Sequence, residues 1–277
     1  MSFTEWKREH RYRSGKIGRY FPIKVVSILR KIIFLKIFIL SVTVFPNIAH
    51  AAEFALIDTP RSHVEAKEAL RGHNRTETGA VEDKATAFLN MARACYELAR
   101  TDEDPRNSPD HFRRIEKLAD QAIDADPEND EGYKWLAIAL GARIKNADLA
   151  AKIQLSRRIK EVIEKALSLD PNDDISLLVL SRWHDKIASL GLGAKTLIRI
   201  VYGGLPDASY AKAEMLLRQA ISIHDRITHR YCLAKVFYHQ GKREAALGQL
   251  RIALTLPVTL PGEAVELEKV RKNITRW

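Results

Sequence analysis

Apolar residues recur at helical spacing through most of the chain after residue 80. The first clear stretch has apolar side chains three or four positions apart, on one side of a helix: Ala85, Phe88, Leu89, Ala92, Cys95, Tyr96 and Leu98. Similar stretches follow to the end of the chain, separated by helix breakers such as Asp126-Pro127 and Asp170-Pro171. No stretch shows the sustained alternation of a β-strand. The pattern predicts an all-α domain over residues 80–277.

Two nine-residue segments of the chain are near copies of each other. AIDADPEND begins at Ala122, and ALSLDPNDD begins at Ala166. A two-helix repeat needs a small residue where its second helix crosses the first and a proline where that helix ends. The alanines fit the crossings, and Pro127 and Pro171 fit the ends. The residues after each proline follow the tetratricopeptide spacing of large-x-x-Leu-small-x-x-large, so the chain is predicted to be a helical-repeat protein.

About four repeat units can be placed, over residues 82–127, 130–171, 174–224 and 227–257. The last has the most regular pattern: Leu233, Ala234, Phe237, Gly241, Ala246, Leu250 and Ala253. The equivalent alanines, Ala122, Ala166, Ala220 and Ala253, are separated by 44, 54 and 33 residues, against about 34 in a plain array. We therefore predict a tetratricopeptide-like solenoid with insertions in units two and three.

The first insertion is expected around residues 145–148, between the helices of unit two. The second, LGLGAKTLIRIVYGGLPDAS, should lie between the helices of unit three and contain a short helix from Lys195 to Tyr202. Leu197, Ile198 and Val201 of this helix are predicted to pack back on the solenoid.

The formal net charge of +10 is concentrated at the start of the chain. Residues 1–51 hold ten basic and two acidic side chains, a net of +8, which leaves +2 for the other 226 residues. Acidic and basic residues alternate through that remainder, whereas a nucleic-acid interface needs a clustered basic patch. We therefore expect no nucleic-acid partner.

The first 51 residues have the pattern of a secretory signal peptide. A basic leader precedes nine apolar or small residues, 37–45, and a spanning helix needs about 20. Ala49-His50-Ala51 fits the small-x-small pattern of a cleavage site, so cleavage is expected between Ala51 and Ala52. The mature protein would then be periplasmic or secreted and would begin with a polar tether, residues 52–79. A mis-assigned start codon, an uncleaved membrane anchor and an organelle presequence are the alternatives.

Two local patterns resemble chemical sites. The segment GLGAKT, residues 191–196, resembles a phosphate-binding loop, but Ala194 stands where that motif needs glycine and a helix precedes it. His184 is adjacent to Asp185, but neighbouring side chains on a helix point about 100° apart and do not face each other. We expect His184 to be a partly buried imidazole whose hydrogen bonds are satisfied.

The other histidines and the two cysteines indicate no metal site. His224, His229 and His239 lack the i, i+4 pairing of a zinc-binding helix. Cys95 and Cys232 fall in the first and last units, so separate buried thiols are expected. The sequence thus predicts no enzyme activity, no cofactor and no metal.

A binding surface remains as the candidate site. In stacked helix pairs the first helices line a concave face, where the second, fifth, ninth and twelfth positions of each unit are exposed. Those positions hold Asn90, Glu97, Lys134, Leu178, Arg182, Asp185, Tyr231, Lys235 and Tyr238. The predicted peptide-binding groove comprises Asn90, Lys134, Arg182, Tyr231, Lys235 and Tyr238.

The chemistry of this predicted groove favours an acidic ligand. Three basic residues and two tyrosines fit a peptide with an acidic side chain or a free carboxylate. The alternative is that Lys134 and Arg182 form solvated surface ion pairs with Glu131 or Asp185.

Several local sequences resemble the regulator of microtubule dynamics protein family and its bacterial tetratricopeptide relatives. They are Gly132-Tyr133-Lys134-Trp135, Lys160 in its helix, Ser181-Arg182-Trp183, Tyr202-Gly203-Gly204-Leu205-Pro206, Ser209-Tyr210 and the run AKVFYHQGKREAALGQLRIALTLPV. The resemblance covers about residues 85–258 and implies a short tetratricopeptide-like solenoid. Animal members are associated with microtubules and mitochondria, whereas the leader of this chain ends in a bacterial-looking cleavage site.

The combined prediction is a non-catalytic, exported helical-repeat adaptor that binds a protein or peptide in the groove. It would contact a membrane only through the N-terminal segment, if that segment stays uncleaved. The alternative is a membrane-anchored or microtubule-associated protein like the animal members of the family that it resembles.

Overall fold

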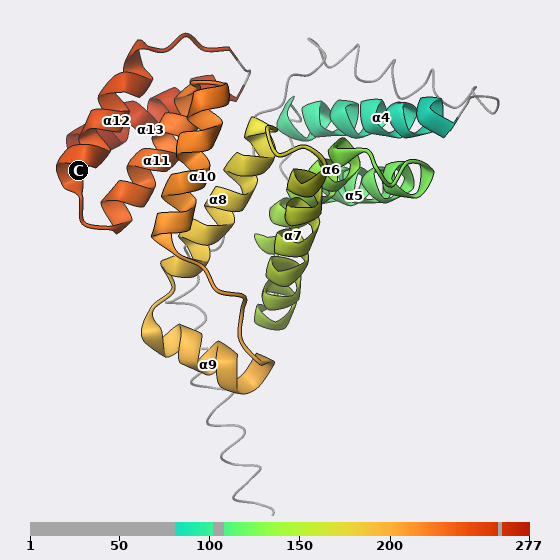
Figure 1. Ribbon diagram of the computed structural model, residues 1–277, viewed down its shortest axis with the longest axis horizontal. Coiled ribbons are helices and arrows are strands. Elements are labelled where there is room, and N and C mark those ends of the chain that lie inside the picture. The colour runs from blue at the N-terminus through green and yellow to red at the C-terminus, as the bar shows by residue number, and fades with distance from the viewer. Residues whose placement is uncertain (1–80, 102–107, 260–261) are drawn as a thin grey trace, which may run out of the picture. The chain divides into compact units, whose positions relative to one another are not determined.

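The computed structural model describes residues 81–101, 108–259 and 262–277, all within the unit Pro46–Trp277. These residues form ten α-helices and contain no strand (Figure 1). The helices are α4 (Val81–Thr101), α5 (Ser108–Ala125), α6 (Asp130–Ile144), α7 (Leu149–Leu169), α8 (Asp174–Ala188), α9 (Leu192–Tyr202), α10 (Tyr210–Ile223), α11 (Ile227–His239), α12 (Arg243–Thr255) and α13 (Glu263–Arg276). The predicted signal peptide, its cleavage position at Ala51 and Ala52, and the tether lie outside the described residues.

The helices pack in pairs, in the order predicted from the repeats. Helix α4 packs against α5, α6 against α7, α8 against α10, and α11 against α12 (Figure 1). The second helix of each pair also packs against the first helix of the next pair, as α5 does against α6 and α10 against α11. Helix α13 packs against both α12 and α11, so it takes the position of the first helix of a fifth pair. The prediction of a tetratricopeptide-like fold is confirmed.

The repeated nine-residue segment encodes the end of one helix and the start of the next. Asp126 and Asp170 each accept a hydrogen bond from the backbone N–H two residues later, which closes the turn after α5 and after α7. Asn129 and Asp173 then cap α6 and α8, because their side chains accept from backbone N–H groups in the first turn of each helix. Such caps satisfy donors that a helix leaves without partners.

The four equivalent alanines are buried on the second helices of the four pairs. Ala122, Ala166, Ala220 and Ala253 are each at most 1% exposed. A small side chain at these positions allows two helix backbones to approach closely, and larger neighbours then fill the core around them. Trp135 is one such neighbour, fully buried with its ring edge-on to Tyr96 at 5.5 Å between centroids.

The two expected insertions differ in kind. In unit two only residues 145–148 separate α6 from α7, and the extra length lies in α7 itself, with 21 residues against 13 in α12. The predicted position between the helices was therefore wrong, because the helical pattern of α7 begins earlier than expected. In unit three the insertion forms α9 between α8 and α10, as predicted.

Candidate functional site

The predicted groove residues fall into two polar groups, the first of which joins α4, α6 and α8. On α4, Arg93 donates a hydrogen bond to Asn90 (2.9 Å) and pairs with Glu131 of α6. One turn further along α6, the Lys134 ammonium lies 3.3 Å from the Asp173 carboxylate, which caps α8. These contacts connect the first helices of three successive pairs.

Lys134 is buried within the first group. The side chain was predicted to be exposed, but the residue is only 7% exposed, so that prediction was wrong. Asp130 and Glu131 lie 3.9 and 3.7 Å from its ammonium, in addition to Asp173. The pairing with Glu131 that was considered as an alternative is present, with the Lys134 side chain buried and the Glu131 side chain 31% exposed. Burial raises the pKa of the Asp130 carboxyl even though Lys134 lowers it.

The second group joins α8 and α11 to α13. Arg182 of α8 and the two tyrosines of α11 each contact a different residue of the C-terminal segment. The contacts are an ion pair of Arg182 with Glu266 (3.7 Å), a hydrogen bond from Asn273 to Tyr231 (3.1 Å) and stacking of Trp277 on Tyr238 (centroids 4.3 Å apart). Arg182 therefore has Glu266 of α13 as an ion-pair partner, and its Nε also donates to Cys232 Sγ at 3.2 Å.

Helix α13 decides which members of the predicted groove stay accessible. Tyr231 is 8% exposed, so its predicted exposure was wrong, because α13 packs against α11. Lys235 is half-buried, with its ammonium 5.7 Å from the Tyr231 ring centroid. Tyr238 is 44% exposed beside Trp277. The sequence analysis predicted helices to the end of the chain but did not predict that α13 packs against α11.

A third polar group was missed by sequence reasoning. Asp174, whose side chain is 8% exposed, contacts His224 Nδ1 at 3.0 Å, Arg226 Nε at 2.8 Å and His229 Nε2 at 3.4 Å. These contacts join the start of α8 to the end of α10 and the start of α11. Burial lowers the pKa of His229. The available signal was the repeated segment, because Asp174 is equivalent to Asp130 and both carboxylates contact a cation.

His184 is buried and lacks the expected hydrogen bond at one nitrogen. The residue is 6% exposed, and its Nδ1 has no hydrogen-bond partner among the described residues. Burial, with the nearby charges of Lys160 and Lys212, lowers the pKa of His184 to about 4. The imidazole is therefore neutral near pH 7, and the expectation of satisfied hydrogen bonds was wrong for this atom.

The cysteine prediction is confirmed, and the described residues provide no metal site. Cys95 and Cys232 are both buried free thiols, and burial raises the pKa of Cys95 to about 11. Within residues 81–101, 108–259 and 262–277, no three His, Cys, Asp or Glu side chains are placed to hold a metal ion.

None of the helices in these ranges combines the length and hydrophobicity that crossing a membrane requires.

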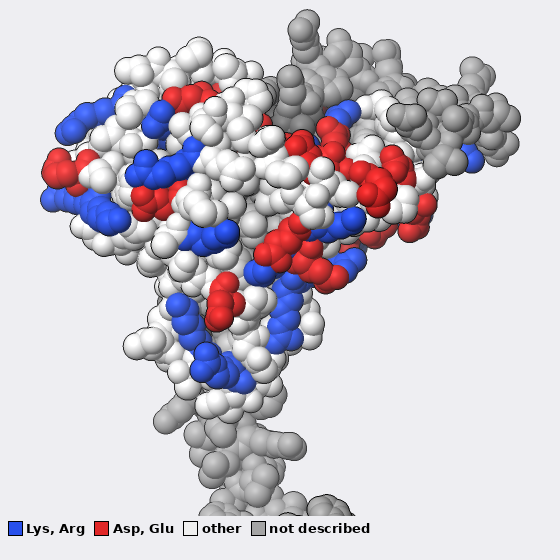
Figure 2. All heavy atoms as spheres, in the orientation of Figure 1, with Lys and Arg blue, Asp and Glu red and all other residues white. Residues whose placement is uncertain are grey.

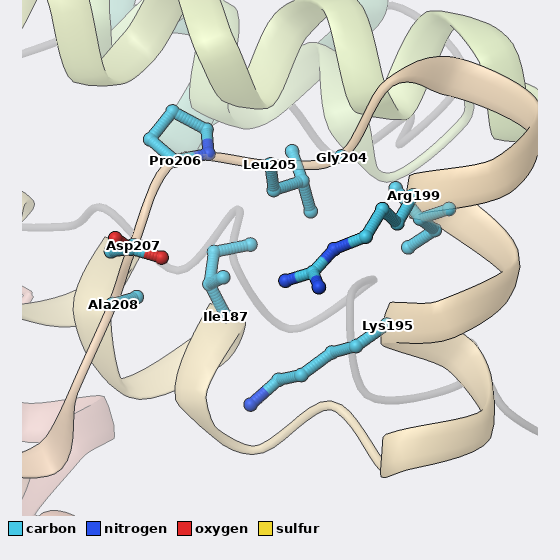
Figure 3. A pocket seen from close by; sticks show the side chains of 9 residues that line it. Ile187, Lys195, Arg199, Gly204, Leu205, Pro206, Asp207 and Ala208 are labelled. Atoms are coloured by element: carbon cyan, nitrogen blue, oxygen red, sulfur yellow. The ribbon is translucent and has the colours of Figure 1, made fainter.

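The insertion in unit three carries a small pocket beside α9. The GLGAKT segment forms the connection to α9 and its first turn, with Gly191 as the N-terminal cap. Arg157 of α7 donates to the carbonyl oxygens of Tyr202 and Gly204, and Lys195 donates to the carbonyl oxygen of Ala188 at 3.0 Å. The pocket of about 110 Å³ lies among the end of α8, α9 and residues 204–208 (Figure 3).

Charged side chains are distributed unevenly over the visible face. Acidic groups gather over α5 to α7, whereas basic groups outnumber acidic ones over the lower lobe that contains α9 (Figure 2). Lys195 and Arg199 reach from α9 toward the pocket, and Asp207 lies across it on the returning chain (Figure 3).

Comparison with known proteins agrees with this architecture. A crystal structure of a thermophilic tetratricopeptide-repeat protein from Thermus thermophilus matches with a TM-score of 0.50 and 18% sequence identity, over 74% of this chain and 87% of that one. At that identity the match shows the fold alone.

Sequence comparison identifies the family. Regulator of microtubule dynamics protein 3 of Xenopus laevis is 26% identical over 177 residues, 63% of this chain but only 38% of that protein. Regulator of microtubule dynamics protein 1 of Caenorhabditis elegans is 26% identical over 207 residues, 72% of this chain and 89% of that protein. The family described as Regulator of microtubule dynamics protein 1-3 matches residues 56–275. The chain therefore belongs to this family of tetratricopeptide-like helical-repeat proteins.

Proposed function

We propose that the protein is a non-catalytic scaffold that binds an acidic protein segment on the inner side of its first helices. The observation that carries this proposal is the docking of α13 against α11, with its Glu266 carboxylate on Arg182 of α8. This contact supports a surface that accepts an amphipathic helix carrying an acidic side chain. Lys235 and Tyr238 are the accessible residues next to it, so they are the proposed contacts for a partner.

Affinity capture with the full chain from its native host, followed by binding measurements with each purified candidate, tests this proposal. The double variant K235E/Y238A should lose the interaction. Arg243→Glu on exposed α12 is the matched charge reversal and should retain it. Substitution of Lys134 or Arg182 is unsuitable, because both side chains pair with buried carboxylates and their loss would destabilise the fold. Equal binding by K235E/Y238A and the unchanged chain would contradict the proposed surface.

We further propose export to the periplasm or the cell exterior after cleavage between Ala51 and Ala52. The support is the basic leader, the short apolar run and the small-x-small pattern of residues 49–51. N-terminal sequencing of the protein from its native host tests this: Ala52 as the first residue agrees with export, and a retained apolar segment indicates a membrane anchor.

Microtubule association is the second candidate function. It is favoured by membership of a family whose animal members are named for microtubule dynamics. Co-sedimentation of the purified full chain with polymerised tubulin tests it. Recovery of the protein in the pellet only when microtubules are present would favour this function over the exported scaffold.

A further inference from the structure

Helix α9 presents apolar side chains to solvent along one side. Leu192 is 86% exposed and Ile200 is 77% exposed, and with the exposed Thr196 they follow i, i+4, i+8 spacing. We call these three residues the α9 strip. Single exposed apolar residues are common on protein surfaces, but two of this size aligned on one short helix indicate a contact surface.

The opposite side of α9 holds the helix in place. Ala194 and Ile198 are 6% and 2% exposed, whereas Val201, which was predicted to pack inward, is 46% exposed. The hydrogen bonds from Arg157 fix the carboxyl end of α9. Because the strip lies on a helix that is already formed, binding of a partner would require little free energy for ordering this surface.

The pocket beside α9 is suited to a single side chain. Its volume of about 110 Å³ is below the roughly 300–1,000 Å³ of typical small-molecule and cofactor sites. Apolar groups form much of its lining: Ile187, Ile198, Leu205 and Pro206. An anchor side chain inserted into such a pocket is the usual centre of a protein–protein contact.

The charges at the pocket favour an acidic ligand. Lys195 and Arg199 are four residues apart and both line the pocket, as Figure 3 shows. Within the part of the chain that the structure describes, no hydrogen bond or ion pair engages the exposed Arg199 guanidinium. Asp207 is the one acidic residue in the lining, so the lining carries a positive net charge. Two copies of this basic surface would repel each other, and a flat lipid surface offers no side chain for the pocket.

We propose that the α9 strip and its pocket form a docking surface for an acidic amphipathic segment of a partner protein. Apolar side chains of that segment contact Leu192 and Ile200, one of them enters the pocket, and its carboxylates pair with Arg199 and Lys195. This surface is separate from Lys235 and Tyr238 on α11, so either proposal can fail alone.

The chain offers a matched pair of variants, because Arg-Ile occurs on both α9 and α12. Arg199 and Ile200 belong to the proposed surface, whereas Arg251 and Ile252 are exposed on α12. A random dodecapeptide library is selected on the full chain after depletion on R199E/I200E. We expect enriched peptides that carry acidic and apolar residues at helical spacing. Fluorescence anisotropy with the best peptide should show an affinity about tenfold lower for R199E/I200E and unchanged for R251E/I252E.

Three results would overturn the proposal. They are a library without enrichment, enriched peptides that lack acidic residues, and equal loss of peptide binding in both double variants. If R199E/I200E is unfolded by circular dichroism, Leu192→Ser replaces it and should also weaken peptide binding, because Leu192 packs little in the fold. Two further results would assign the surface to another occupant: α9-dependent binding to vesicles of phosphatidylserine and phosphatidylcholine without peptide binding, or an α9-dependent dimer in sedimentation velocity.

Discussion

Helices α9 and α13 both stand outside the four helix pairs and both bury apolar side chains, yet α9 also leaves two large apolar side chains almost fully exposed. Val270 of α13 is fully buried against α11 and α12, and Glu266 is 1% exposed beside Arg182. Leu192 and Ile200 of α9 stay in solvent. The difference follows from position: α13 continues the stack, where the next first helix belongs, whereas α9 leaves the stack between α8 and α10. A helix in an insertion can thus keep an apolar side for a partner.

The largest expected effect on stability comes from a charge on the buried side of α13. Val270→Asp should lower the free energy of unfolding by roughly 3 kcal/mol, because the carboxylate would be buried among apolar side chains. Val265 on the same helix is 59% exposed, so Val265→Asp should change the free energy of unfolding by less than about 0.5 kcal/mol. Urea unfolding followed by circular dichroism measures both. Equal effects would show that α13 is not packed as described.

Acid should destabilise the fold through His184, which is buried on α8. Its pKa is about 4 in the folded chain against 6.5 for an unperturbed histidine. The unfolded state therefore takes up a proton first, and stability falls as pH drops from 6.5 toward 4, by roughly 3 kcal/mol from this group. His184→Gln should remove that part of the pH dependence, measured as the difference between two urea series. If His184→Gln leaves the dependence of stability on pH unchanged, His184 is not its source. The control Ile200→Glu, on the exposed side of α9, should leave that dependence unchanged.

Removing the ion pair that joins α13 to α8 tests the covered helix directly. Arg182→Ala should cost about 2 kcal/mol of stability, since it removes one cation from the buried Glu266 carboxylate and leaves the Lys269 ammonium at 3.6 Å. Arg271→Ala breaks an exposed pair with Glu268 on the same helix and should cost close to nothing. Thermal unfolding of the two variants provides the comparison. A similar loss in both would mean that burial of Glu266 has little effect.

The smallest effect is expected where α9 is anchored. Arg157→Ala removes the hydrogen bonds to the carbonyls of Tyr202 and Gly204, so amide hydrogens of α9 should exchange faster while those of α13 are unchanged. Global stability should fall by no more than about 1 kcal/mol. Arg158→Ala breaks only an exposed pair with Glu161 and serves as the control. Unaltered exchange in α9 would show that other contacts hold the helix.

The sequence predicted on which helices the groove residues lie, whereas peptide binding by them stays a prediction. All six predicted groove residues lie on the first helices of their pairs, and they fall into the two polar groups described above. The exposure of Lys134 and Tyr231 was mispredicted because it depends on helices far away in the sequence. Arg182 and Glu266 are 84 positions apart, and no local pattern connects them. The contacts of Asp174 were also missed, since its partners lie 50 or more positions away, at the end of α10 and the start of α11.

The sequence by itself determined the number and order of the helix pairs, the positions of the four equivalent alanines and the helix ends at the two repeated segments. These features depend on interactions within a few residues, namely the spacing along a helix and the capping of its free N–H groups. Only the tertiary structure decided that α13 covers Tyr231 and receives Arg182, and that α9 keeps Leu192 and Ile200 in solvent. Burial is set by which distant helix lies above a side chain, and that information is not local in the chain.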